Sequence, residues 1–286
     1  MLKENELEQI ALECRKRILR CAWRANGGHI APSYSCIEIL TTLYFSDILK
    51  FDAKNPNWTE RDYFILSKGH AVLALYSVLA KAGYYEENLL DDFCQKGSEF
   101  GSLAKKGTVP GIEASTGSLG HGLSYAVGIA LALKKDRKEN HVYVLLGDGE
   151  CEEGSVWEAL MSAVHNKLDN MTIIVDYNHL QAMGDIEEIL TFDRIADRMN
   201  AFGLNTVEID GHDFREIHKA LLIRKENPTV VIANTVKGKG ISFMENVPIW
   251  HYRIPNDEEI GTALDELQMT REELGEHEKC LFRNII

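Results

Sequence analysis

A regular alternation of apolar, β-branched runs with helical patterns dominates the second half of the 286-residue chain. The pattern predicts strands at 141–146, 171–176, 206–209 and 229–234, with helices at 122–135, 154–166 and 214–225. Buried strands that alternate with helices are typical of a parallel sheet covered on both faces. We therefore expect an α/β fold, with a mostly parallel sheet and helices on both faces.

The first part of the chain adds an amphipathic helix at 7–22, a short strand at 62–66 and an apolar helix that begins at Ala71. We find no internal repeat, low-complexity tract or long linker. A single domain over residues 1–286 is the simplest interpretation. The last thirty residues are acidic and helix-prone, and we expect them to form a surface extension.

Charge and composition exclude several classes of function. The formal net charge of −13 argues against a nucleic-acid or membrane surface, because both need a basic face. No run of about 18 apolar residues occurs, and the charged N-terminus does not resemble a signal peptide. The six cysteines are scattered without a C-x-x-C pair, so we expect reduced thiols and a cytoplasmic protein.

The triplet Gly147-Asp148-Gly149 ends one predicted strand, and Asn178 follows the next strand along the chain. Ligands of parallel sheets bind at the carboxyl ends of the strands, so both positions should face one crevice. The glycines let the backbone approach a phosphate, and the following helix presents its N-terminus to that anion. Oxygen ligands from Asp148 and Asn178, together with phosphate oxygens, suit Mg²⁺. The pair therefore predicts a site for Mg²⁺ and a phosphorylated ligand.

Several short stretches resemble, in the right order, the motifs of transketolases, which are thiamine-diphosphate enzymes. They are Asn26-Gly-Gly-His29, Leu66-Ser-Lys-Gly-His70, Ser115-Thr-Gly-Ser-Leu-Gly-His-Gly122, GDGECEEG…VDYNHLQAMG within 147–184, Ile209-Asp-Gly-His-Asp213, Thr235-Val-Lys-Gly-Lys-Gly240 and Trp250-His251. The resemblance covers nearly the whole chain. It implies the thiamine-diphosphate-binding fold, with thiamine diphosphate and Mg²⁺ as cofactors.

The resemblance also implies a role for individual residues. Mg²⁺ would be held by Asp148, the Asn178 side chain and the Leu180 carbonyl. His70, Gly149 and His251 would face the diphosphate, and Gly117 and Leu119 would contact the thiamine rings. Glu153 would belong to an acidic network that links two active sites, so these six residues are the other cofactor-binding candidates. His29 would lie near the reacting carbons. His29, His70 and His251 are the candidate catalytic residues.

Other residues have weaker signals. His70 precedes an apolar helix, where the N-terminus favours an anion, so its position supports a ligand role independently. His141, His165, His179 and His218 match no motif and are expected at the surface or at helix ends. Lys237 and Lys239 lack the spacing of a nucleotide-binding P-loop. No G-x-G-x-x-G follows a strand, so we do not expect a nicotinamide dehydrogenase.

A transketolase polypeptide of the usual kind carries two further domains, one of which supplies the glutamate that activates the aminopyrimidine ring. A chain of 286 residues is too short to hold them. The resemblance thus implies a split enzyme in which a second, C-terminal subunit supplies that glutamate, in an α₂β₂ assembly. Its reaction would transfer a two-carbon ketol unit from a ketose phosphate to an aldose phosphate.

Three stretches depart from the family pattern: Ile30-Ala-Pro32 after the first histidine, Gly101-Ser102-Leu103 in place of a third substrate histidine, and His121 where glutamine is commoner. They leave open a modified (branched, sulfonated or deoxy) sugar phosphate as substrate. Other thiamine-diphosphate enzymes, namely a 2-oxo acid dehydrogenase α chain or deoxyxylulose-phosphate synthase, are alternatives. A non-catalytic regulatory paralogue is a further alternative from a different class.

Overall fold

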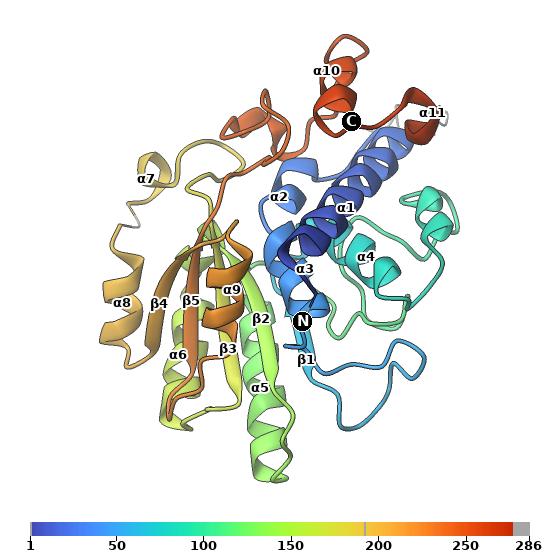
Figure 1. Ribbon diagram of the computed structural model, residues 1–286. Coiled ribbons are helices and arrows are strands. Elements are labelled where there is room, and N and C mark those ends of the chain that lie inside the picture. The colour runs from blue at the N-terminus through green and yellow to red at the C-terminus, as the bar shows by residue number, and fades with distance from the viewer. Residues whose placement is uncertain (1, 192, 277–286) are drawn as a thin grey trace.

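Five parallel strands form the centre of the computed structural model, which describes residues 2–191 and 193–276 (Figure 1). They are β1 (Tyr63–Leu66), β2 (Val142–Gly147), β3 (Met171–Tyr177), β4 (Asn205–Asp210) and β5 (Thr229–Asn234). Their order across the sheet is β1-β2-β3-β5-β4, and every neighbouring pair is parallel. All five carboxyl ends therefore meet at one edge of the sheet.

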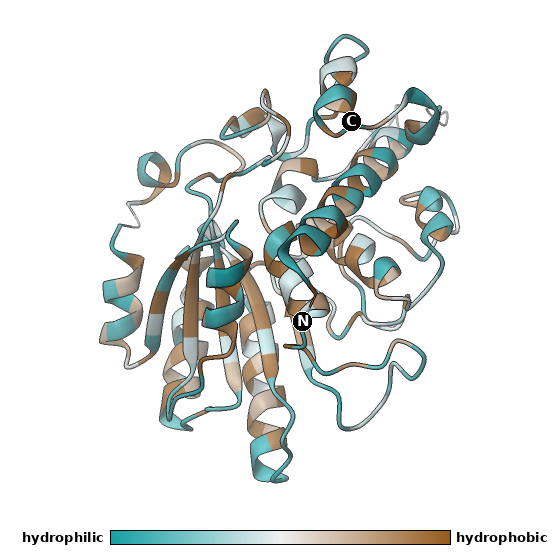
Figure 2. Ribbon diagram, viewed as in Figure 1, coloured by the Kyte–Doolittle hydropathy of each residue, from teal (hydrophilic) through white to brown (hydrophobic). Residues whose placement is uncertain are grey.

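Helices cover both faces of the sheet, which confirms the predicted α/β class. Along β2, Val142 and Val144 point into one apolar cluster, whereas Tyr143 and Leu145 point into the other. The first cluster lies under α5 (His121–Lys135), α6 (Gly154–His165) and α8 (Ile195–Ala201), the second under α1 (Glu4–Ala25), α3 (Ile37–Phe45), α4 (Val72–Lys81) and α9 (Phe214–Leu221). Figure 2 shows β1, β2, β3 and β5 as mainly hydrophobic, as expected for strands buried on both sides, whereas the edge strand β4 is more polar.

The predicted strands and most predicted helices are present within a few residues of their expected ends. Several helices were not predicted, α8 among them. Two others, α2 (Ile30–Tyr34) and α3, are buried on nearly every side and so show no amphipathic period. Helix α9 ends at Leu221, earlier than expected. The Arg224 side chain donates hydrogen bonds to the carbonyls of Leu221 and Ile223 and so satisfies acceptors at this helix end.

The described part of the C-terminal region is helical and mostly exposed, and one side of it packs on the rest of the domain. Helix α10 (Glu259–Glu266) buries Ile260 and Ala263, and α11 (Arg271–Leu274) packs against α1 (Figure 1). Residues 277–286 of this segment lie outside the described residues. The remaining short helices are η1 (Gly69–Ala71), η2 (Glu87–Asp92), η3 (Gly149–Glu152), α7 (Ile186–Ile189) and η4 (Pro248–His251).

The expectation of a surface or capping position was wrong for His141. This residue is buried beside β2, and its Nε2 lies 2.8 Å from Thr172 Oγ1. His165 and His179 are exposed as expected, and His218 is half-buried. In the ranges that the structure describes, no helix is both long and apolar enough to cross a membrane.

Candidate active site

A cavity of about 590 Å³ opens at the carboxyl edge of the sheet. All ten residues named above as cofactor, metal or catalytic candidates line it: His29, His70, Gly117, Leu119, Asp148, Gly149, Glu153, Asn178, Leu180 and His251. They come from six separate stretches of the sequence, which the parallel topology brings to one place. Their individual roles stay predictions.

Asp148 organises the oxygen-rich part of the cavity. Its Oδ2 accepts the backbone N–H groups of Asn178 at 2.9 Å and His179 at 2.6 Å, and its Oδ1 accepts that of Gly149. Burial, together with the nearby carboxylate of Asp176, raises the pKa of Asp148 to about 6. A cation bound here would offset that cost, because it stabilises the ionised carboxylate.

The oxygens at this position suit a hard cation. Asn178 Oδ1 accepts the N–H of Leu180 at 3.2 Å, and the Leu180 carbonyl has two lone pairs, one of which accepts from Lys237. Among the described residues, no group of three or more His, Cys, Asp or Glu side chains forms a protein-only metal site. A carboxylate, an amide oxygen and a carbonyl oxygen would suit Mg²⁺, which takes few ligands from the protein itself.

Two glycines keep side chains out of the cavity. A Cβ on Gly149 would lie 2.9 Å from the Gln181 side chain. Gly117 has φ +145, and a Cβ there would lie 2.8 Å from Leu103 Cδ1. Only glycine adopts such a φ at little cost, so the backbone at Gly117 stays accessible to a flat ring.

Three histidines form a cluster in the cavity. The ring centroids of His29, His70 and His251 lie 5.3 Å from one another in all three pairs. Burial lowers the pKa of His29 to about 4 and that of His251 to about 3, and the ammonium groups of Lys237 and Lys68 add to the effect. Burial also lowers the pKa of His70 well below its usual value. All three imidazoles are therefore neutral near pH 7 and can each donate and accept one hydrogen bond.

Two of these rings keep an unused nitrogen. In the part of the chain that the structure describes, Nδ1 of His29 and Nδ1 of His251 are buried without a hydrogen-bond partner. A buried polar atom in that state is costly unless something binds to it. Both atoms belong to residues that line the cavity, so a polar ligand there would satisfy them.

Two buried lysines in the cavity were missed as site residues by the sequence analysis. Lys68 is 1% exposed and Lys237 is 2% exposed. Lys237 Nζ donates to the carbonyls of Leu180 at 2.9 Å and Gln181 at 3.1 Å. Burial, together with the charge of Lys68, lowers the pKa of Lys237 to about 8. The available signal was a lysine within a glycine-rich turn directly after a buried strand.

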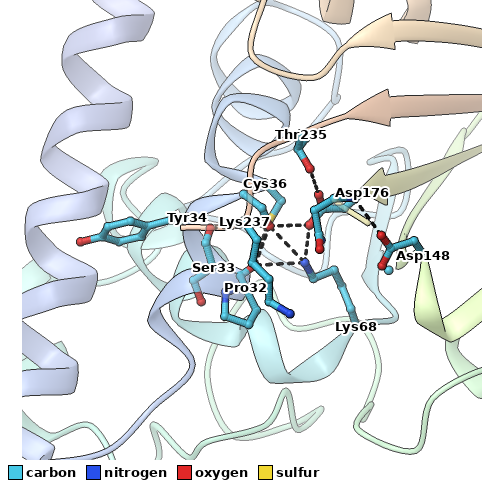
Figure 3. A network of polar contacts seen from close by, with 12 residues as sticks. Pro32, Ser33, Tyr34, Cys36, Lys68, Asp148, Asp176, Thr235 and Lys237 are labelled. Carbon is cyan, nitrogen blue, oxygen red and sulfur yellow. Dashed lines mark hydrogen bonds and ion pairs between the residues drawn. The ribbon is translucent and has the colours of Figure 1, made fainter. Parts of the chain in front are cut away.

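Buried carboxylates tie the loops of the site together. Asp176, at the end of β3, accepts hydrogen bonds from Lys68, Ser35 and Thr235 (Figure 3). Glu150 accepts from the Ser67 hydroxyl and from the N–H of Gly120, at 2.9 Å for the latter. The two carboxylates thus join β3, the segments that follow β1, β2 and β5, and the loop that precedes α5.

The stretches that depart from the family pattern lie in different places. Pro32 and Leu103 line the cavity. His121 does not: it begins α5, is exposed, and its Nδ1 lies 3.0 Å from the Leu119 carbonyl. Only the first two departures can therefore touch a ligand in the cavity directly.

Comparisons with known proteins agree with this geometry. Residues 11–280 match the model of the family described as "Transketolase, thiamine diphosphate binding domain". The chain is 43% identical over 272 residues to one of the subunits of the apulose-4-phosphate transketolase of Actinobacillus succinogenes, covering 93% of this chain and 98% of that protein. It is 39% identical to "6-deoxy-6-sulfo-D-fructose transketolase subunit SqwG" of a Clostridium species, covering 93% and 98% respectively.

The fold is similar to that of solved transketolases. The crystal structure of transketolase from Campylobacter jejuni aligns with a TM-score of 0.88 and 32% identity. The alignment covers 94% of this chain but only 43% of that enzyme. The chain therefore spans less than half of the full-length transketolase, whereas it spans nearly all of the two subunits above.

Proposed function

This chain belongs to the transketolase family, and we propose that it is the cofactor-binding subunit of an enzyme that transfers a two-carbon ketol unit between sugar phosphates. The observation that carries the proposal is the single cavity lined by all ten candidate residues. When bound, thiamine diphosphate supplies the carbanion that cleaves a bond next to a ketose carbonyl. We also propose that residues 1–286 form a single thiamine-diphosphate-binding domain.

The chain's part is to hold and orient the cofactor. Asp148, the Asn178 side chain and the Leu180 carbonyl would hold Mg²⁺, which in turn holds the diphosphate. Gly149, His70, His251 and the Lys237 ammonium group would face the diphosphate oxygens, and Gly117 and Leu119 the rings, with Glu153 at the cavity edge. The Lys237 ammonium group donates to carbonyls and not to a carboxylate, so together with a bound Mg²⁺ it would attract the diphosphate in a chain of net charge −13.

The neutral histidines would handle protons on the sugar. His29 lies between His70, His251 and Tyr252, and its Nδ1 has no partner among the described residues. A neutral imidazole can accept a proton from a sugar hydroxyl or donate a hydrogen bond to its oxygen. A positioned group of this kind typically contributes about 10²–10⁴-fold to a rate.

A second subunit would complete the active site. Support comes from the two relatives named as subunits, which this chain matches over 98% of their length. Apolar side chains are also exposed on loops that line the cavity: Met183 is 89% exposed, Ile249 65% and Leu190 54%. A second subunit bound over the cavity would bury these side chains. We propose that a C-terminal transketolase subunit binds here, supplies the activating glutamate and forms an α₂β₂ complex.

The sugar is proposed to be a modified one. The two relatives are named for apulose 4-phosphate and for 6-deoxy-6-sulfo-D-fructose, neither of which is an ordinary pentose phosphate. Pro32 and Leu103, which belong to two of the stretches that depart from the family pattern, present apolar surface to the cavity. A lost hydrogen bond to a substrate hydroxyl changes preference by about tenfold or more.

Calorimetric titration of the full chain with thiamine diphosphate tests the cofactor part of the proposal. We expect saturable binding that requires Mg²⁺, for the chain alone or together with the second subunit. Absence of binding under both conditions would contradict the proposed function. A matched titration with thiamine monophosphate is the control, because it keeps the rings and removes one phosphate that the metal would hold.

A further inference from the structure

The segment 235–240 follows β5 and brings Lys237 into the cavity. Gly238 in this segment has φ +84, and a Cβ there would lie 2.6 Å from the Met244 carbonyl oxygen. Figure 3 shows the Lys237 side chain beside Pro32, with its ammonium group apart from the contacts centred on Asp176. Thr235 anchors the start of the segment to Asp176, so the path of the backbone immediately around Lys237 depends on further contacts.

Glu38 lies behind this segment, buried in α3. Its carboxylate accepts hydrogen bonds from Arg15 of α1, at 2.7 and 2.9 Å, and its Oε2 lies 3.0 Å from His212 Nδ1. The three side chains are 9%, 8% and 15% exposed, respectively. Glu38 thus joins two helices to the loop that follows β4.

Both partners of Glu38 also contact the segment that carries Lys237. The N–H of Val236 donates to His212 Nε2 at 2.8 Å. Arg15 Nε donates to the Lys239 carbonyl at 2.9 Å. The first contact lies one residue before Lys237 and the second lies two residues after it, so the backbone is held on both sides.

The hydrogen bonds fix the protonation of this network. Because the Val236 N–H donates to Nε2 of His212, that nitrogen carries no hydrogen, and the ring proton resides on Nδ1. Nδ1–H therefore donates to Glu38. Burial alone would raise the pKa of Glu38, but the Arg15 guanidinium and His212 hold it below its usual value. An ionised Glu38 orients the Arg15 and His212 side chains toward itself. Arg15 Nε and His212 Nε2 are then placed to hydrogen-bond with the backbone of the segment.

We propose that Glu38, Arg15 and His212 are positioning residues that hold the segment 235–240 so that the Lys237 ammonium group faces the diphosphate. The identity of that anion rests on the proposed function, whereas the placement of the segment does not. None of the three residues lines the cavity, so they act through Lys237 and do not touch the ligand.

Two variants of His212 separate a positioning role from general stability. In His212→Asn the side-chain amide can still donate to Glu38, but it offers no acceptor to the Val236 N–H. In His212→Gln the side-chain oxygen reaches the position of Nε2 and can accept that N–H. The stability control is Glu113→Gln, which breaks a similarly buried ion pair with Arg61, 12% and 14% exposed, away from this segment.

The experiment uses the full chain and two measurements. Hydrogen–deuterium exchange reports the residues 236–240, and calorimetry gives the affinity for inorganic pyrophosphate with Mg²⁺. We expect His212→Asn to speed exchange in this segment and to weaken pyrophosphate binding about tenfold. His212→Gln should keep both close to wild type, and Glu113→Gln should change the melting temperature alone.

Unchanged exchange at 236–240 in His212→Asn would overturn the proposal, as would equal pyrophosphate affinity in the Asn variant and the wild type. If wild-type protein binds no pyrophosphate, the diphosphate site in the proposed function fails instead. In that case hydrogen–deuterium exchange alone tests whether His212 holds the segment 235–240. Faster exchange in His212→Asn but not in His212→Gln supports that role, and equal rates in both variants and wild type contradict it.

Discussion

Lys68 and Asp176 form an ion pair that is almost completely withdrawn from solvent, with side chains 2% and 0% exposed. Burial would raise the pKa of Asp176, but the adjacent Lys68 ammonium group holds it below its usual value. The same carboxylate accepts from Ser35 and Thr235 (Figure 3). One pair thus fixes the loop after β1 relative to the ends of β3 and β5, where the cavity lies.

Breaking this pair should destabilise the protein strongly. We expect Lys68→Met to lower the free energy of unfolding by about 3–5 kcal/mol, because it leaves the Asp176 charge buried without a partner. The double variant Lys68→Met/Asp176→Asn should recover part of that loss. Lys134→Met, in the exposed pair with Asp169, should cost no more than about 1 kcal/mol. Urea unfolding measures all three, and similar small losses for the two single variants would contradict the expectation.

Replacement by alanine should destabilise the protein at Gly117 and stabilise it at Gly128. Gly117→Ala forces a side chain into φ +145 and against Leu103, so we expect a loss of about 1–2 kcal/mol and weaker binding of thiamine diphosphate. Gly128 lies in α5 with no atom near a Cβ, so Gly128→Ala should add about 0.5–1 kcal/mol. Thermal unfolding and calorimetry would show this, and normal cofactor affinity in Gly117→Ala would rule out close ring contact.

His141 should make the fold sensitive to acid. Burial, helped by Arg224, lowers its pKa from 6.5 to about 3. Between these values the unfolded chain binds a proton that the folded chain does not. Stability due to this group therefore falls as the pH falls, by about 1.4 kcal/mol per unit.

The test compares unfolding free energies of wild type and His141→Gln from pH 7 to pH 4. Whatever its sign at pH 7, the advantage of wild type over the variant should shrink steadily toward pH 4. Gly128→Ala changes no titratable group, so its difference from wild type should stay constant. A difference for His141→Gln that is equally constant would show that the folded protein protonates this histidine normally.

Asp148→Asn should largely remove the rise in melting temperature that thiamine diphosphate and Mg²⁺ cause. A ligand present at about a hundred times its Kd stabilises a protein by about 2.7 kcal/mol, so thiamine diphosphate with Mg²⁺ should raise the melting temperature of wild type clearly. The variant lacks the carboxylate among the proposed ligands and should show little rise. Asp169→Asn, far from the cavity in an exposed pair, is the matched control. An undiminished rise in Asp148→Asn would exclude Asp148 as a metal ligand.

The apolar pattern was sufficient to predict the strands and the shared crevice of Asp148 and Asn178, whereas most of the ten cavity residues were predicted from the family resemblance. Strand residues such as those of β2 are apolar on both faces, and parallel strands deliver the residues after them to one edge. Asp148 and Asn178 could therefore be paired from the strand pattern alone. Each of the two residues directly follows a predicted strand, and this position is what indicates that they share a crevice.

Other features depend on contacts that no local pattern reveals. Lys68, Lys237 and Glu38 are charged residues in buried positions, and their side-chain partners include residues from 23 to 174 positions away along the chain. His141 looked like a strand-end residue, but the neighbouring strand supplies Thr172 as its partner. Helix α3 has almost no exposed face, so its sequence lacks a marked amphipathic period. In each case tertiary packing decides the outcome.

If the proposed function is right, this chain transfers ketol units only together with a second subunit. The most direct test is a transfer assay on the chain mixed with the candidate C-terminal subunit, with thiamine diphosphate, Mg²⁺ and ribose 5-phosphate as acceptor. Xylulose 5-phosphate, apulose 4-phosphate and 6-deoxy-6-sulfo-D-fructose would each be supplied as donor. We expect turnover only when both subunits are present, and faster turnover with a modified sugar. No transfer from any donor by a mixture that binds the cofactor would contradict the claim.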